Sequence, residues 1–121
     1  MQTNTRMAQG EAEDLGREMQ RLASAQAGLD HDFCALVARF DEGEGIGWFQ
    51  GLKTTAHFLA FACSMSPAVA REHVRVARAL RSMPATDGLF AQGRLSYSKV
   101  RELTRLAGQV AEEGLLSLAL E

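Results

Sequence analysis

Hydrophobic residues in the N-terminal third of the chain recur at steps of three and four, which is the period of one face of an α-helix. Between about Glu11 and Asp41 these positions are Leu15, Met19, Leu22, Leu29, Phe33, Leu36, Val37 and Phe40. The spacing predicts one long helix, with a break near Gly28 as the alternative. The helix must stop before the loop that carries Trp48, because that loop is punctuated by Gly43, Gly45, Gly47 and Gly51.

Shorter helices follow, and most begin at a residue that favours a helix N-terminus. They are expected from Thr54 or Thr55 to about Ala62, from Ser66 to about Ser82, from about Asp87 to Gln92, from Ser96 to about Ala107 and from about Gln109 to Leu120. No segment shows the alternation of a β-strand. We therefore predict an all-α fold, a compact bundle of about five or six helices with a long N-terminal helix and helix-turn-helix-like hairpins. Residues 1–10 are expected to form a disordered tail, and residues 11–121 a single helical domain.

A stretch of twelve residues recurs thirty positions later in the chain. Residues 66–77 align without gaps on residues 96–107, and Ser, Arg, Glu, Arg and Ala are identical at 66/96, 71/101, 72/102, 75/105 and 77/107. A duplication and a chance match between two helices rich in Ala and Arg both explain this similarity. In either case each copy predicts a turn, a serine cap and an arginine-bearing helix.

The small net charge of the chain is a cancellation. Thirteen Lys and Arg residues against fifteen Asp and Glu residues give a formal charge of −2, which taken alone argues against nucleic-acid binding. Divided along the chain, the charge is −5 over residues 1–50, +6 over residues 51–110 and −3 over the last eleven. The basic charge therefore lies mainly on the two repeated helices. Most of it is arginine, which favours bidentate contact with phosphate or carboxylate.

Residues 59–70 have the spacing of a helix-turn-helix, in which small side chains let two helices cross closely over a tight turn. Ala60 and Ala70 take the small positions, and Ser64 stands at the turn where most such proteins have glycine. Arginines at i, i+4 and i+7 of the second helix share one face of it. Guanidinium groups stacked in this way suit a phosphate backbone or guanine edges. The candidate nucleic-acid contacts are Arg71, Arg75, Arg78, Lys99, Arg101 and Arg105.

The alternative for these arginines is a solvated helix face. Arg75 lies three residues after Glu72, close enough for a local ion pair. In the loop before the helix-turn-helix, Trp48 and Phe49 are expected to anchor the loop to the core rather than to form a stacking platform.

The sequence shows no catalytic, metal-binding or cofactor-binding pattern. His31, His57 and His73 form no ligand cluster, and the glycine-rich loop precedes no phosphate-binding sequence. Cys34 and Cys63 have no paired spacing and are expected to be buried free thiols. No apolar run approaches the length of a membrane span, and the N-terminus lacks the apolar stretch of a signal peptide. We therefore expect no catalytic residue, no metal, no cofactor and no membrane partner, and a cytoplasmic location.

Several segments together resemble one known family. They are residues 32–41, Gly47-Trp48, residues 55–59, residues 66–80, Met83-Pro84 and residues 93–101, and the stretch over 66–101 is the most specific. Over about residues 15–120 the chain resembles the domain of unknown function 222, also called the 13E12 repeat family. Proteins of that family are abundant in actinobacteria and usually carry this domain ahead of a C-terminal HNH nuclease domain.

The resemblance implies a non-catalytic helical accessory domain of an HNH endonuclease, which engages DNA or positions the nuclease. No catalytic residue is carried over, because the metal-binding HNH residues of the family would lie beyond Glu121. The alternative is a protein-interaction or oligomerisation scaffold without DNA contact, in which the acidic long helix pairs with the basic helices of its own or another subunit.

The last helix leads to one more expectation. Its leucines form an apolar face with no capping residue after it, so we expect a chain truncated at its C-terminus, which forms a homo-oligomer or lacks the nuclease segment that covers this face. These leucines are Leu115, Leu116, Leu118 and Leu120.

Overall fold

Six α-helices and one 3₁₀ helix make up the computed structural model, which describes residues 5–120. In chain order they are α1 (Gln9–Glu42), η1 (Gly45–Trp48), α2 (Thr55–Ala62), α3 (Pro67–Leu80), α4 (Pro84–Ala91), α5 (Tyr97–Arg105) and α6 (Glu112–Ala119). The described residues contain no β-strand. The predicted all-α fold with a long N-terminal helix is confirmed.

The long helix α1 passes through Gly28 without a break. A Cβ atom added at Gly28 would lie 3.9 Å from the carbonyl oxygen of Ala91, so this glycine marks a place where the end of α4 comes close to α1. The helix begins at Gln9. Residues 1–4 of the predicted disordered tail lie outside the described residues.

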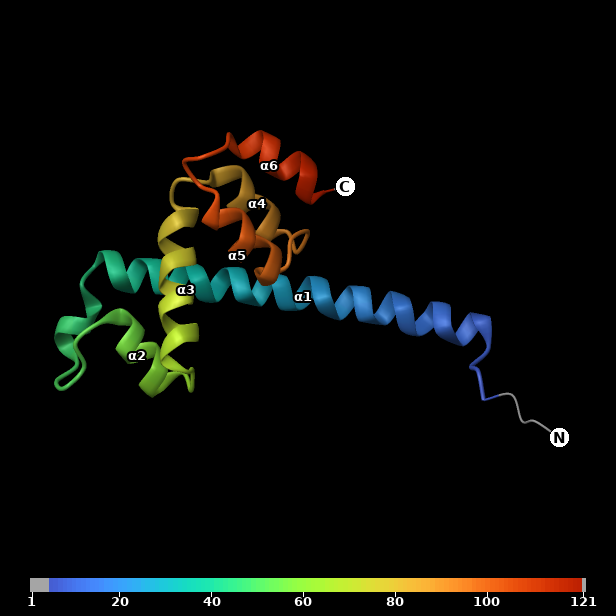
Figure 1. Cartoon of the computed structure of the whole chain (residues 1–121). Coiled ribbons are helices and arrows are strands. Elements are labelled where there is room, and N and C mark those ends of the chain that lie inside the picture. The colour runs from blue at the N-terminus through green and yellow to red at the C-terminus, as the bar shows by residue number, and fades with distance from the viewer. Residues whose placement is uncertain (1–4, 121) are drawn as a thin grey trace.

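The bundle forms around the C-terminal half of α1. The buried residues of this helix are Ala27, Cys34, Val37 and Ala38. Every residue from position 9 to position 26 is exposed, apart from the partly buried Gly16. Figure 1 shows the other helices gathered at one end of α1, while its N-terminal half extends away from them. About half of this helix therefore stays exposed to solvent.

Two helical hairpins, α2–α3 and α4–α5, repeat one arrangement. In each, an eight-residue helix is followed by a turn and a serine-capped helix. The Ser66 hydroxyl accepts a hydrogen bond from the backbone N–H of Val69 at 3.3 Å, and the Ser96 hydroxyl accepts one from Lys99 at 3.2 Å. The similarity seen in the sequence thus extends in the structure to the helix before each serine.

The turns of both hairpins use the left-handed backbone region that glycine adopts most readily. Ser64 has φ = +59° between α2 and α3, and Gly93 has φ = +76° between α4 and α5. The backbone at Ser64 is therefore of the kind expected at a helix-turn-helix glycine, although the side chain is not. Pro84 does more than end α3, because it also occupies the first turn of α4, where proline is favoured.

The hydrophobic core lies between these hairpins and α1. Its largest fully buried hydrophobic side chains are Phe90, Leu95, Val76 and Val100. Val100 occupies in the second hairpin the position that the equally buried Ala70 has in the first. The repeated helices therefore direct matching positions into one core and leave their arginines on the surface.

The apolar face expected on the last helix is half covered. Glu112, at the start of α6, accepts hydrogen bonds from the backbone N–H groups of the second and third residues of α4, at 3.3 and 2.8 Å. This side chain satisfies amides that a helix start leaves without partners, and so docks α6 on α4. Two of the four leucines, Leu115 and Leu116, are buried by this docking, and Leu118 and Leu120 are exposed.

The expectation of two buried thiols is right for Cys34 and wrong for Cys63. Cys34 lies on the packed side of α1, and burial raises the pKa of its thiol to about 12, with the charges of Asp30 and Asp87 acting in the same direction. Cys63 is exposed, because it follows the last residue of α2 at the turn into α3.

The loop after α1 is anchored by one of its two aromatic residues. The Phe49 ring packs on Phe40 and Phe58, with ring centroids 5.9 and 4.8 Å away. Trp48 is 91% exposed, so the expectation that it anchors the loop is wrong. Phe49 already fills the space beside the other two rings, and its neighbour in the chain faces solvent.

Candidate nucleic-acid interface

Three candidate arginines of α3 line one groove. The Ser66 cap and Pro67 fix the start of α3, and its apolar residues face the core. Arg71, Arg75 and Arg78 therefore share the outer face, where they border a groove of about 410 Å³ together with the first turn of α2. The predicted common face of these three residues is confirmed.

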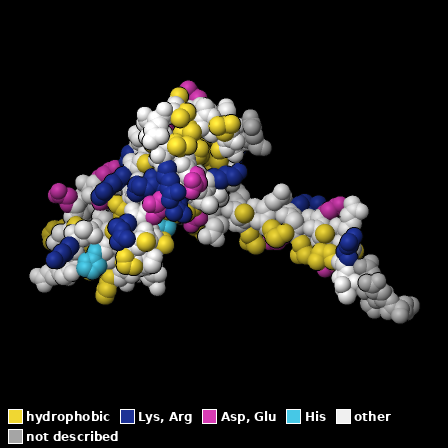
Figure 2. Space-filling model, viewed as in Figure 1, with side chains coloured by type: hydrophobic (Ala, Val, Ile, Leu, Met, Phe, Trp, Pro, Cys, Tyr) yellow, Lys and Arg dark blue, Asp and Glu magenta, His cyan; other side chains and the backbone are white. Residues whose placement is uncertain are grey.

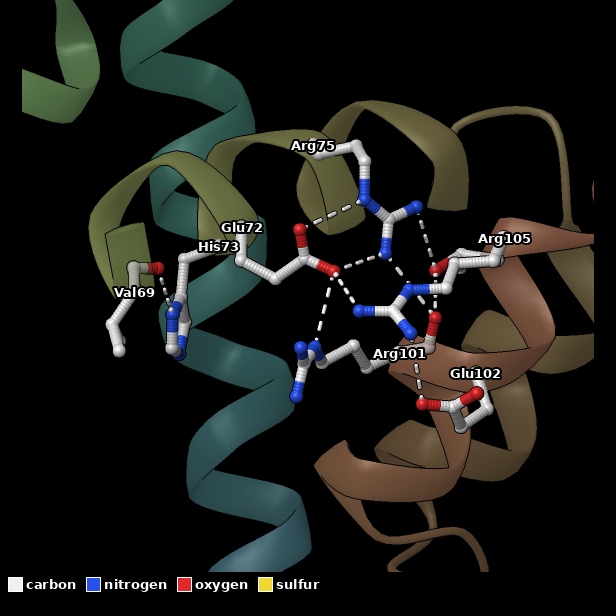
Figure 3. Close-up of polar contacts among 8 residues, drawn as sticks. Val69, Glu72, His73, Arg75, Arg101, Glu102 and Arg105 are labelled. Atoms are coloured by element: carbon white, nitrogen blue, oxygen red, sulfur yellow. Dashed lines mark hydrogen bonds and ion pairs between the residues drawn. The ribbon is translucent and has the colours of Figure 1, made fainter. Parts of the chain in front are cut away.

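A single carboxylate joins the arginines of α3 and α5. Glu72 accepts from Nη2 of Arg75 at 2.6 Å and from Nε of the same residue at 3.1 Å. The same carboxylate accepts from Arg101 Nε at 3.1 Å and lies 3.4 Å from Arg105 Nη2. Figure 3 shows the three guanidinium groups converging on Glu72 from two helices. Arg75 of the first copy and both arginines of the second copy thus meet at the glutamate of the first copy.

Further hydrogen bonds fix Arg75 between the two helices. Its Nη1 donates to the Thr104 hydroxyl at 3.3 Å, and its Nη2 donates to the Arg101 carbonyl at 3.2 Å. Hydrogen bonding from Arg75, with a smaller contribution from Arg101, lowers the pKa of Glu72 to about 2. Glu72 is therefore ionised throughout the neutral range.

Arg78, another arginine of the groove, is bound to α1. Arg78 donates to Asp41 through Nε at 2.8 Å and through Nη2 at 3.0 Å. The Thr55 hydroxyl donates to the same carboxylate at 2.8 Å. The pKa of Asp41 is lowered, mainly by the hydrogen bond from Arg78. Asp41 is thus shared by α2 and α3, and it holds Arg78 at the edge of the groove.

Two candidates differ from the others in their surroundings. Arg71 is exposed and makes no hydrogen bond or ion pair within residues 5–120. Lys99 lies on the side of α5 that faces α6, where its ammonium group donates to the carbonyl of Ala119 at 3.4 Å. The structure therefore brings five of the six candidates to one face and places Lys99 elsewhere.

The face remains positive after its ion pairs are counted. Five arginines lie against three carboxylates, those of Asp41, Glu72 and Glu102, which leaves a formal charge of +2. Figure 2 shows a dark blue band of Lys and Arg side chains across the body, with acidic groups among them. A guanidinium group has five N–H donors, so an arginine held by one carboxylate still offers donors to a second anion.

Two ion pairs join the end of α1 to α3 and to the residue directly after it, and the sequence does not predict either pair individually. Arg78 binds Asp41, and Arg81 donates to Glu42 through Nε at 2.7 Å. The signal in the sequence was the segregation of charge, acidic before residue 50 and basic after it. The partners could not be assigned, because nothing local shows that α3 crosses the end of α1.

No group of three or more His, Cys, Asp or Glu side chains gathers in the described part of the chain to hold a metal ion. Among its helices, none has the length and apolar content to cross a membrane.

Comparison with known families assigns the chain. A family model described as "Domain of unknown function (DUF222)" matches residues 13–119. The chain belongs to the DUF222 family. No curated protein and no solved structure gave a significant match. The DUF222 match includes all residues of the arginine face, and its description states no activity.

Proposed function

We propose that this DUF222 chain binds the DNA backbone through its arginine face, as the non-catalytic accessory domain of an HNH endonuclease. The observation that supports this most is the convergence of arginines from α3 and α5 on one surface that keeps a positive charge after pairing. Contacts to phosphate oxygens position a protein on a duplex without reading its sequence.

The carboxylates on this face have a defined part in the proposal. Glu72 and Asp41 hold guanidinium groups in fixed orientations, so less side-chain freedom is lost when a phosphate binds. Arg71, which has no partner in the described residues, is the group most available to a phosphate. We expect it to contribute directly to affinity.

Affinity for duplex DNA at two salt concentrations tests the proposal. Each phosphate contact releases counterions, so the binding constant should fall steeply between about 50 and 200 mM salt. Fluorescence anisotropy with two labelled duplexes of unrelated sequence should give similar affinities. Absence of binding at low salt, or an affinity that does not change with salt, would contradict the proposal.

The variant Arg71→Glu gives the first residue-level prediction. Loss of one phosphate contact and introduction of a repelling charge should weaken binding by about tenfold at 0.1 M salt and reduce the salt dependence. Arg17→Glu is the matched control, because this substitution makes the same change of charge on the projecting half of α1. Equal losses in the two variants would show that the affinity reflects total charge only.

The accessory role has its own test. The coding sequence downstream of Glu121 should continue in frame into a segment with HNH-type histidines. An immediate stop codon there would contradict the accessory role and leave the DNA-binding proposal to the anisotropy experiment. The chain alone should not cleave DNA when a divalent metal is added.

One observation favours a second candidate, a protein-interaction scaffold without DNA contact. Four of the six candidate basic residues are bound to carboxylates of the chain itself, namely Arg75, Arg78, Arg101 and Arg105. If these arginines serve only to join helices, their replacement lowers thermal stability and the wild-type chain does not bind DNA at low salt.

A further inference from the structure

The projecting helix α1 carries leucine at every seventh residue. Leu15, Leu22, Leu29 and Leu36 are 46, 53, 70 and 61% exposed. Residues seven apart lie almost above one another on a helix, since seven residues make nearly two turns. Figure 2 shows hydrophobic side chains in a row along the projecting part. The row continues along the packed half of the helix, so the bundle leaves this face of α1 open.

A second row lies four residues after each leucine and completes a heptad pattern. It consists of Met19, Gln26, Phe33 and Phe40. Met19 is 65% exposed, whereas Phe33 and Phe40 pack partly against the body. In heptad terms the leucines are the d positions and the second row the a positions. From Leu15 to Leu29 both rows are exposed to solvent. After Leu29 the leucine row remains exposed, whereas the second row packs against the body.

We propose that this face binds the same face of a second copy of the chain, as a parallel, in-register two-helix coiled coil. The heptad pattern is self-complementary, because a and d side chains of one helix fit between those of an identical helix. Leucine at every d position is typical of parallel dimers, and a single polar a residue such as Gln26 fixes register. The proposal does not depend on DNA binding.

Charges beside the seam fit the parallel arrangement. In a parallel coiled coil, the positions beside the seam are e, directly after each d leucine, and g, three residues after each d leucine. Each g residue of one helix faces the e residue five positions later in the partner helix. Glu11 then faces Gly16, Glu18 faces Ala23, and Asp30 faces Ala25, so no acidic side chain meets another. An antiparallel pairing would set g positions against each other and bring Glu11 or Glu18 near Asp32. Like charges placed together across an interface oppose association.

The exposed area and the length of the free segment also point to a partner. Burying a partly exposed leucine removes roughly 60–90 Å² of apolar surface, so five such residues on each of two helices supply on the order of 600–900 Å². This approaches the roughly 1,000 Å² of a specific interface, and side-chain stems beside the seam add to it. Seventeen of the eighteen residues from position 9 to position 26 are exposed, so this segment lacks the packing that supplies most helical stability in proteins.

The mass of the full chain in solution tests the proposal. Sedimentation equilibrium at roughly 100 μM chain, above the micromolar dissociation constants typical of modest interfaces, should give about twice the chain mass of 13.2 kDa. Leu22→Glu places a charge in the middle of the seam and should give a monomer whose helical bundle still unfolds cooperatively on heating. Gln20→Glu adds the same charge on the opposite side of α1 and should remain a dimer.

Two further variants exclude other interfaces. Leu118→Glu alters the exposed leucine of α6 and should leave the dimer intact. In a Cys63→Ser background, Leu15→Cys should oxidise to a disulfide-linked dimer, because a parallel register places the two copies of residue 15 together. A monomeric wild-type chain, a dimer lost with Leu118→Glu but kept with Leu22→Glu, or failure of the cysteine variant to cross-link would each overturn the proposal.

Discussion

Glu72 of α3 binds side chains from both arginine-bearing helices, and its surroundings have a consequence for stability. Its carboxylate is shared by Arg75, Arg101 and Arg105. The first two of these lower its pKa to about 2, below the value of about 4.3 expected in an unfolded chain. The folded state therefore favours the ionised form more strongly than the unfolded state does.

The pH dependence of unfolding should show this difference. The contribution of Glu72 is fully present above about pH 4.5 and is lost as the pH falls through about 2, because the folded-state pKa is the lower one. Glu72→Gln should lower the free energy of unfolding by about 1–2 kcal/mol at pH 7 and flatten its decline in acid. Urea denaturation at several pH values measures both effects.

Glu102→Gln is the control for this prediction. Glu102 occupies the equivalent position of α5, but within residues 5–120 its one ion pair is with Arg105, at 3.3 Å, and it is more exposed. Its replacement should change stability by less than about 0.5 kcal/mol. Equal effects at the two positions would show that sharing among three guanidinium groups adds nothing to the stability of the fold.

At the scale of elements, the contact between α1 and the turn after α4 is the tightest approach at a glycine. Gly93 has a positive φ, and a Cβ atom there would lie 2.6 Å from the carbonyl oxygen of Ser24. A side chain at this position would be strained by its backbone and would also push α1 away. The turn of the second hairpin is therefore restricted to glycine for two separate reasons.

Gly93→Ala should lower the free energy of unfolding by about 2–3 kcal/mol, from backbone strain together with the clash. Gly88→Ala is the matched control, since Gly88 lies inside α4 with no atom within 4 Å of an added Cβ. That substitution should stabilise the chain by about 0.5–1 kcal/mol, because alanine favours helix. Thermal or urea denaturation decides, and a neutral Gly93→Ala would contradict the close approach.

Most helices could be predicted because their signals are local. The caps at Ser66 and Ser96 and the apolar period of α1 depend only on neighbouring residues, and they place three helices within a few positions. The predicted start of α4, at about Asp87, is three residues late, because Pro84 both follows the end of α3 and occupies the first turn of α4. A proline between two helices fits both roles.

The partners of the arginines could not be predicted in the same way. The local pair of Arg75 with Glu72 follows from spacing along one helix. The bonds of Arg101 and Arg105 to that glutamate, and of Arg78 to Asp41, depend on how helices cross. Periodicity likewise locates the apolar face of α1 but does not show which part of that face the bundle covers.

At the scale of the whole molecule, the acidic and basic parts of the sequence meet in two places. Asp41 and Glu42 at the end of α1 bind Arg78 of α3 and Arg81, the residue directly after α3, so part of the charge separation seen along the chain is used inside the fold. The acidic groups on the projecting half of α1 pair locally, as Asp14 with Arg17 and Glu18 with Arg21. The net positive charge is left on the face of α3 and α5.

The length of α1 also determines how the molecule scatters X-rays. A helix of 34 residues is about 51 Å long, whereas a compact chain of 121 residues has a radius of gyration of about 14 Å. Small-angle scattering from the monomeric Leu22→Glu variant should give a clearly larger radius and a distance distribution with a long tail. A value near 14 Å would mean that the helix folds back onto the body in solution.

This elongated shape affects the behaviour of the chain on a gel-filtration column. A rod attached to a small body sweeps out a larger volume as it tumbles than a sphere of equal mass. A single copy should therefore elute ahead of a compact protein of 13.2 kDa, at a volume close to that of a compact dimer. Mass determined by sedimentation equilibrium or light scattering, rather than elution position, distinguishes one copy from two.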